Sequence, residues 1–151
     1  MSSQIVTDAP DPLLLALAEF RFALRNFLHF SECAAQEAGL HPQQHQLLLQ
    51  VAAAPRDTAV NIAYAADRLG LKHNSAVELV DRSEREGLLE RTADTADKRR
   101  TILRVTRKGR NVLGRLTVNH ARELNELGPQ LALVLKRISI HRPAGSGVEV
   151  Q

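Results

Sequence analysis

Aromatic residues and cysteine are scarce in this chain, and tryptophan is absent. Only 3% of the 151 residues are aromatic, so a base-stacking platform for single-stranded nucleic acid is not expected. Cys33 is the only cysteine, which excludes an internal disulfide and gives no indication of an oxidising compartment. The sequence also lacks a Gly-rich phosphate loop, a serine-centred nucleophile motif and a set of clustered metal ligands. We therefore expect no enzyme, no cofactor and no metal site.

Long apolar runs and an N-terminal targeting pattern are missing as well. No stretch approaches the roughly 20 apolar residues that a membrane span needs. The first residues, MSSQIVTDAPDP, do not combine a basic start with an apolar run, as a signal peptide would. We expect a cytoplasmic protein, and the length fits one domain with its own hydrophobic core.

Apolar residues recur at helical spacing over the first half of the chain. Asp11 followed by Pro12 is a typical helix start, and the apolar stripe that follows predicts a helix to about Ala38. A second helix is expected to begin at Pro42 and to end before Pro55.

Two short helices with a tight connection are expected next. Asn61 would cap the first, which Gly70 ends; Asn74 or Ser75 would cap the second, which Gly87 ends. Two helices joined by so short a turn have the proportions of a helix-turn-helix.

The region after these helices predicts a β-hairpin. Residues 88–91 and 101–106 are candidate strands around a polar segment at 92–100, and the second strand alternates through Thr101, Leu103 and Val105. A helix-turn-helix followed by a strand, a long tip and a strand is a winged helix. A long helix is expected from Thr106 to about Glu126, with a break at residues 127–129 and a final helix over 130–140.

The expected fold class is mainly α with a small β wing (α+β): a winged helix-turn-helix with N- and C-terminal dimerisation helices. We expect a flexible N-terminus at 1–10, dimerisation helices at 11–40 and 107–140, the DNA-binding lobe at 41–106, and a disordered tail at 141–151. The terminal helices carry more apolar surface than one small lobe can cover, which predicts a homodimer.

Basic residues are concentrated in one stretch that contains no acidic residue. Its members are Lys98, Arg99, Arg100, Arg104, Arg107, Lys108 and Arg110. DNA phosphates attract such a patch through counterion release, and an arginine at a hairpin tip can enter the minor groove. We expect Lys98, Arg99 and Arg100 to contact DNA; the alternative is a solvated charge run without a partner.

The second helix of the helix-turn-helix is the candidate reader of bases. Asn74 could bond to adenine, Glu78 to the cytosine amine and Val77 to a thymine methyl group. Ser75 and Lys72 suit phosphates better. An alternative for Glu78 is an ion pair with Arg82 one turn later. The expected DNA-binding residues here are Lys72, His73, Asn74, Ser75, Val77, Glu78 and Arg82, and Asp81 is expected to face outward with them.

Residues 69–109 resemble the multiple-antibiotic-resistance regulator (MarR) family, and the resemblance extends over about residues 11–140. The reading helix runs into VDRSEREGLL at 80–89, and AGLHPQQHQLLL at 38–49 is similar to the family's second helix. Two departures are Ser83, where a leucine normally packs, and Glu78, where a basic or polar residue is common. The family's Asp-x-Arg and strand-ending Leu-Thr-x-x-Gly patterns correspond here to Asp97, Arg99, Val105, Thr106 and Gly109.

The resemblance implies a transcription regulator, a repressor in the simplest case, that binds a palindromic operator in double-stranded DNA as an obligate homodimer. Asp97 is expected to orient the Arg99 guanidinium through a charge-assisted hydrogen bond. Family members commonly respond to small anionic or phenolic effectors bound between the dimer helices and the lobe. The residues that could line such a cleft here are Phe27, His29, Phe30, His41 and His45.

Three other interpretations remain open. Cys33 could act as a redox sensor, although the negative end of a helix macrodipole discourages a thiolate there. His41 and His45 could hold a metal, but two ligands do not complete a site. A winged helix can also bind a protein instead of DNA, for which an acidic or apolar wing would be typical.

Overall fold

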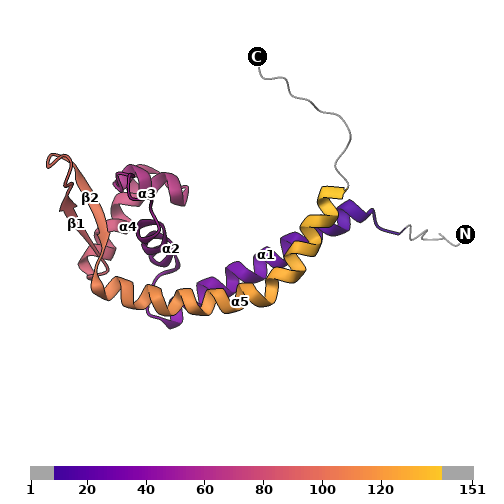
Figure 1. Cartoon of the computed structure of the whole chain (residues 1–151). Helices are drawn as coiled ribbons and strands as arrows, with labels where there is room; N and C mark the ends of the chain where they lie inside the picture. The colour runs from indigo at the N-terminus through magenta and orange to yellow at the C-terminus, as the bar shows by residue number, and fades with distance from the viewer. Residues whose placement is uncertain (1–8, 141–151) are drawn as a thin grey trace, which may run out of the picture. The chain divides into compact units, whose positions relative to one another are not determined.

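The computed structural model describes residues 9–140 and contains five helices and one β-hairpin in that range (Figure 1). The elements are α1 (Pro12–Glu37), α2 (Pro42–Ala52), α3 (Ile62–Leu69), α4 (His73–Arg85), β1 (Leu89–Ala93), β2 (Thr101–Val105) and α5 (Arg107–Ile140). The predicted fold class is confirmed: a helical protein with a two-stranded wing and long helices at both ends. Within the described range, no helix is long and apolar enough to cross a membrane. The expected tail at 141–151 and most of the expected flexible N-terminus lie outside the described residues.

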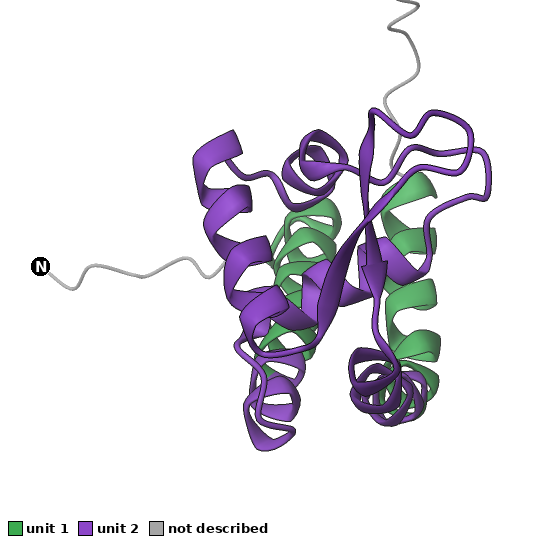
Figure 2. Cartoon of the chain, turned by 90° about the vertical axis from the view of Figure 1, so that its left-hand side faces the viewer, with its two compact units in different colours: residues 1–29, 122–151 green, residues 30–121 purple. Residues whose placement is uncertain are grey.

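The chain divides into two compact units, coloured separately in Figure 2. Unit 1 comprises residues 1–29 and 122–151, and unit 2 comprises residues 30–121. The division falls inside α1 and inside α5. Unit 2 therefore contains the winged lobe together with the last turns of α1 and the first half of α5.

The core of unit 2 is formed by side chains from all of its elements. Leu47 and Leu48 of α2, Val80 of α4 and Leu116 of α5 are at most 2% exposed. The wing strands pair antiparallel, with Leu89 opposite Val105. Leu103 and Val105 are buried as the alternation predicts, but Thr101 at the tip end of β2 is exposed. β1 also extends to Ala93, two residues further than predicted.

The predicted break at residues 127–129 is wrong, because α5 continues through Pro129 to Ile140. A proline inside a helix removes one backbone hydrogen bond and crowds the carbonyl one turn earlier. Pro129 is exposed, so water can solvate the backbone carbonyl one turn earlier, which receives no hydrogen bond from the proline. Apolar and charged helix-forming residues on both sides extend the helix across this position.

The start of α4 also differs from the prediction. The helix begins at His73, its N-cap is Lys72, and no side chain makes a capping hydrogen bond there. Gly70 adopts a left-handed conformation with φ of 62° at the end of α3, and the short turn that follows brings the chain into α4 two residues earlier. Asn74 and Ser75 are therefore exposed first-turn residues instead of caps.

Candidate nucleic-acid interface

One face of α4 packs into the lobe and the other is open to solvent. Ala76, Leu79, Val80 and Ser83 are buried. The Ser83 hydroxyl donates to the Leu79 carbonyl at 2.8 Å, which satisfies it within the helix. The smaller side chain at this position is thus accommodated without an unpaired polar group.

The predicted reading residues lie on the open face. Lys72, His73, Asn74, Ser75, Glu78 and Arg82 are exposed, while Val77 and Asp81 are half-buried. The alternative Glu78–Arg82 ion pair does not form among residues 9–140. The polar groups of this face are thus available to a partner.

A salt-bridge cluster that the sequence analysis missed joins α4 to the wing. Arg91 of β1 approaches Asp81 at 2.6 Å and also pairs with Glu84. The hydrogen bond to Asp81, followed by the contact with Glu84, raises the pKa of Arg91. Asp81 was expected to face outward, and 49% of its side chain is exposed while its carboxylate contacts this guanidinium. In the sequence, the only indication of this cluster is a pair of acidic residues three positions apart on one helix, followed by an arginine in the next strand.

The wing tip is organised by aspartates that accept backbone hydrogen bonds. Asp94 accepts from the Ala96 amide at 3.0 Å, and the Asp97 carboxylate accepts from the Arg99 amide at 3.0 Å. The nearest guanidinium to Asp97 is that of Arg100, at 3.7 Å. The expectation that Asp97 bonds to the Arg99 guanidinium is therefore wrong, since Asp97 positions the main chain of Arg99 and leaves its side chain exposed.

The seven basic residues of the wing region divide into two groups. Lys98 and Arg99 are exposed at the tip, with Arg100 beside them and Arg104 on β2. In contrast, Lys108 donates to the Glu86 carbonyl at 2.8 Å and Arg110 to the Val105 carbonyl at 3.3 Å. Lys108 and Arg110 of α5 are thus held against the base of the wing. The third basic residue in this part of α5, Arg107, is exposed.

Thr106 and Gly109 seat α5 against the turn between α4 and β1. The Thr106 hydroxyl donates to the Gly87 carbonyl at 2.5 Å and accepts from the Gly109 amide at 3.1 Å. Its amide donates to the Leu88 carbonyl at 3.1 Å. These contacts connect the wing base, the end of α4 and α5.

The residues predicted to line an effector cleft are distributed over both units. Phe27 and His29 belong to unit 1, and Phe30, His41 and His45 to unit 2. His41 caps α2, because its Nδ1 accepts from the Gln43 amide at 3.2 Å and the backbone amide of His41 donates to Gln44 Oε1 at 2.9 Å. This role is structural.

The buried His45 contacts the half-buried His120, which the sequence analysis did not select. The two rings are 4.8 Å apart, and Phe30 contacts His120 edge-on at 5.4 Å. His120 Nδ1 is 2.7 Å from the Leu116 carbonyl and its Nε2 is 2.8 Å from the Ser31 hydroxyl. A carbonyl only accepts, so Nδ1 carries the proton and, in the neutral ring, Nε2 accepts from Ser31.

The environment of His45 favours its neutral form. Its side chain is 3% exposed, and its Nδ1 has no hydrogen-bond partner among the described residues. Burial, and secondarily the charge of His120, lowers the pKa of His45 to about 4. No group of three or more metal-ligand side chains comes together within residues 9–140, and Cys33 is half-buried in α1.

We predict a stability loss in mild acid that depends on His45. Since the folded pKa lies below the unfolded value, the unfolded chain takes up a proton first, and stability decreases as the pH falls from about 6.5 towards 4. Between pH 7 and about 4.5 the free energy of unfolding of the wild type should decrease by about 2 to 3 kcal/mol more than that of His45→Leu. Urea unfolding at both pH values measures this, and parallel losses in the two proteins would contradict it.

Comparisons with known proteins support the architecture described above. A family model described as the MarR family matches residues 38–100. Comparison of the sequence with curated proteins finds no match.

Solved structures with a similar fold cover most of the chain. A point mutant of MepR from Staphylococcus aureus has a TM-score of 0.68 at 20% identity, over 80% of this chain and 94% of that chain. CouR from Rhodococcus jostii, bound to p-coumaroyl-CoA, has a TM-score of 0.58 at 23% identity, over 80% and 87%. The PcaV regulator from Streptomyces coelicolor has a TM-score of 0.54 at 26% identity, over 78% and 90%.

Proposed function

Because this chain belongs to the MarR family of winged-helix transcription regulators, we propose that it binds a palindromic DNA operator as a homodimer and represses transcription by occupying it. The observation that carries the proposal is the pairing of an open polar face on α4 with a basic wing tip in the same unit. Family membership also identifies a regulator, not an enzyme. A mutant MepR, one of the structural neighbours, is bound to an oligodeoxyribonucleotide.

The α4 face is proposed to enter the major groove with its N-terminal residues first. The exposed Asn74 side chain makes no capping bond, so both its donor and acceptor can pair with adenine. Lys72 and Ser75 are placed for phosphates beside it, and His73, Val77, Glu78 and Arg82 complete the contact face. The Arg91 cluster would hold this helix at a fixed angle to the wing, so that both reach the duplex together.

The wing tip is proposed to contact the neighbouring minor groove. Asp97 fixes the main chain at Arg99, which reduces the entropy lost when the exposed guanidinium binds DNA. Lys98 and Arg100 would add phosphate contacts, whose contribution decreases steeply with salt. A basic tip of this kind argues against a protein-binding role for the wing.

The homodimer is supported by apolar side chains exposed on both long helices. In α1 these include Leu14, Leu17, Phe22, Leu24 and Leu28, and in α5 they include Leu124, Leu133 and Leu135. A monomer rarely leaves so many large apolar groups in water. We propose that a second copy of the chain covers them, which would place two reading helices about one DNA turn apart.

We also propose that a small aromatic or anionic effector releases the protein from DNA. Two structural neighbours are described with bound small molecules: CouR with p-coumaroyl-CoA and MepR with ethidium bromide. The expected cleft residues Phe27, His29, Phe30, His41 and His45 remain the candidates for this role, with His41 the weakest because of its capping function. A cytoplasmic location is part of the same proposal.

The proposal is tested by selecting bound fragments from random duplex DNA at two salt concentrations. We expect an enriched palindrome with half-site centres about 10 base pairs apart, since two-fold symmetry repeats the reading helix once per turn. Selection of no motif at either salt concentration, or of a single unrepeated half-site, would contradict it.

Arg99→Ala is expected to weaken binding to all DNA sequences alike and to flatten its salt dependence. Each neutralised phosphate contributes about one to the slope of log K against log salt. The magnitude of this slope should therefore decrease by about two for the dimer, which carries two copies of Arg99. Fluorescence anisotropy with operator and scrambled duplexes over a salt series measures both quantities. An unchanged slope would mean that the wing is not part of the DNA interface.

Asn74→Ala is the matched contrast because it removes no charge. It should leave the salt slope unchanged and reduce discrimination at one base position in each half-site by about 1–3 kcal/mol. The same anisotropy assay with single-base operator variants measures this loss. Equal discrimination by wild type and variant would place the reading face elsewhere.

A further inference from the structure

Glu78 is the acidic side chain of α4 that has no ion-pair partner in the part of the chain that the structure describes. The other two acids of this helix, Asp81 and Glu84, both pair with Arg91. Glu78 is also exposed. Its carboxylate is therefore available to a molecule outside the chain, whereas its two neighbours serve the lobe itself.

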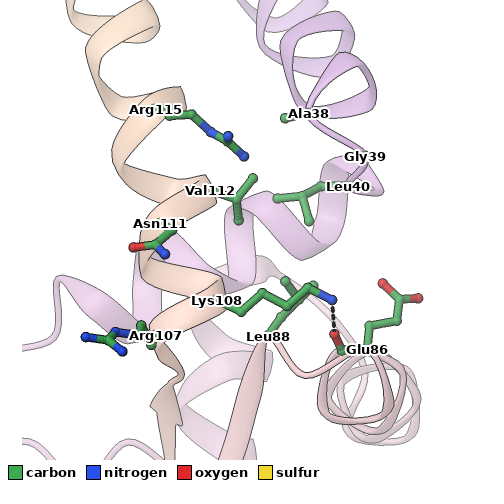
Figure 3. Close-up of a pocket in the computed structure, with 10 residues that line it drawn as sticks. All are labelled: Ala38, Gly39, Leu40, Glu86, Leu88, Arg107, Lys108, Asn111, Val112 and Arg115. Carbon is green, nitrogen blue, oxygen red and sulfur yellow. Dashed lines mark hydrogen bonds between the residues drawn. The ribbon is translucent and has the colours of Figure 1, made fainter.

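The acid that directly follows the helix is occupied as well. Glu86 is the C-cap of α4, and its carboxylate accepts from the side-chain amide of Gln44 at 2.8 Å. Its backbone carbonyl accepts from Lys108 of α5 at 2.8 Å, the bond drawn in Figure 3. The contacts at this end of α4 fix the helix to α2 and α5, and Glu78 takes no part in them.

Glu78 lies in the middle of the open face of α4, one turn after Asn74. Residues four positions apart share a helix face, and they are about 6 Å apart along the axis. Exposed cations stand at both ends of this face: Lys72 at the N-cap and Arg82 one turn beyond Glu78. Such a face suits the major groove, because phosphates line its edges and base edges form its floor.

A carboxylate in the major groove accepts hydrogen bonds and donates none. The groove offers it two donors, the N4 amine of cytosine and the N6 amine of adenine. Adenine carries the acceptor N7 beside its amine, and this atom repels a carboxylate oxygen. Cytosine has only a C–H group at the corresponding place, so cytosine is the base that Glu78 selects.

The negative charge of Glu78 also opposes binding to other sequences. The phosphates repel it wherever the protein lies on a duplex, and the carboxylate loses hydration when it enters the groove. The cytosine amine offsets both costs by donating a hydrogen bond. Glu78 therefore lowers the affinity for DNA in general and raises discrimination, the opposite of what a basic side chain at this position would do.

We propose that Glu78 makes DNA binding depend on an unmodified cytosine amine in each half-site, so that methylation of this amine releases the protein. One N4 hydrogen pairs with guanine and the other points into the major groove. In a paired N4-methylcytosine the methyl group replaces the groove hydrogen, so the carboxylate loses its donor and faces an apolar group. This sensitivity to DNA modification rests on the proposed function.

Selection from random duplex DNA tests which base Glu78 reads. Wild type, Glu78→Gln and Glu78→Ala are compared with Glu90→Gln, which removes the same charge from an exposed acid of β1. Wild type and Glu90→Gln should select cytosine at one position of each half-site, within about two base pairs of the position that Asn74→Ala relaxes. Glu78→Gln should select adenine there, because glutamine pairs with adenine N6 and N7, and Glu78→Ala should select no base there.

Modified duplexes test the dependence on the amine. The duplex selected by wild type is synthesised with cytosine or N4-methylcytosine at this position of one half-site, and affinities are measured by fluorescence anisotropy. Methylation should weaken binding of wild type and Glu90→Gln about ten- to a hundredfold, as for the loss of one hydrogen bond to a charged group. Glu78→Ala should bind both duplexes within about twofold. It should also bind a scrambled duplex more tightly than Glu90→Gln does, because it lacks the carboxylate among the phosphates.

Three results would each overturn the proposal. They are equal wild-type affinity for the methylated and unmethylated duplexes, the same selected bases in wild type and both Glu78 variants, and tighter binding of the scrambled duplex by Glu90→Gln than by Glu78→Ala. In these cases a palindrome selected by wild type leaves the proposed function intact. A wild type that selects no palindrome refutes the proposed function itself, and the role of Glu78 with it.

Discussion

Gly109→Ala is expected to destabilise the winged lobe by about 3 kcal/mol, the upper part of the range for overpacking. An added Cβ at this position would lie 2.3 Å from the Leu88 carbonyl oxygen and 2.7 Å from Cγ1 of Val105. The first of these atoms belongs to the main chain, so no side-chain rotation relieves the contact. Either α5 moves away from the α4–β1 turn or the base of the wing is displaced.

Gly114→Ala is the matched control in the same helix. A Cβ added there meets nothing within 4 Å, and alanine is the better helix former by about 1 kcal/mol. Chemical denaturation at matched protein concentration should therefore show a lower free energy of unfolding for Gly109→Ala and a higher one for Gly114→Ala, each relative to wild type. Similar stability of Gly109→Ala and wild type would mean that α5 is not seated on Leu88 as described.

Phe22→Asp is expected to dissociate the proposed homodimer. Phe22 is 63% exposed on α1, and the proposed interface would bury it twice, once per subunit. An unpaired carboxylate is strongly disfavoured at an apolar interface, and about 2 kcal/mol per copy raises the dimer dissociation constant by roughly a thousandfold. Operator affinity should fall with it, because one lobe alone reads only a half-site.

Sedimentation over a concentration series measures this effect, and Phe22→Leu is the control because it keeps an apolar side chain. We expect the leucine variant to remain a dimer and the aspartate variant to become a monomer with a folded lobe by circular dichroism. If Phe22→Asp sediments as a wild-type dimer, the exposed face of α1 is not the interface.

Local patterns predicted most of the fold in this protein. Three of these patterns act within a few residues, so their consequences could be read along the chain: the left-handed Gly70, the Asn61 cap, and the burial of every second residue at Leu103 and Val105. The exposed side of α4 followed from the same reasoning, because a helix with one apolar stripe buries that stripe. The basic wing tip was visible as a charge run.

Other features depend on contacts between residues distant in sequence, and only the tertiary structure decided them. Asp81 and Glu84 meet Arg91 because β1 folds back along α4, and His120 meets His45 because α5 passes over α2. The continuity of α5 through Pro129 shows the same limit, since one unfavourable residue is outweighed by the helix on both sides.

From its sequence alone, this protein was determined to be a winged helix with a basic hairpin, because periodicity, caps and charge runs are local properties. The tertiary structure alone decided that Asp97 binds the main chain of Arg99, how closely Gly109 approaches Leu88, and which acids Arg91 meets. These three depend on the separation of main-chain segments in space, which the order of residues along a chain does not specify.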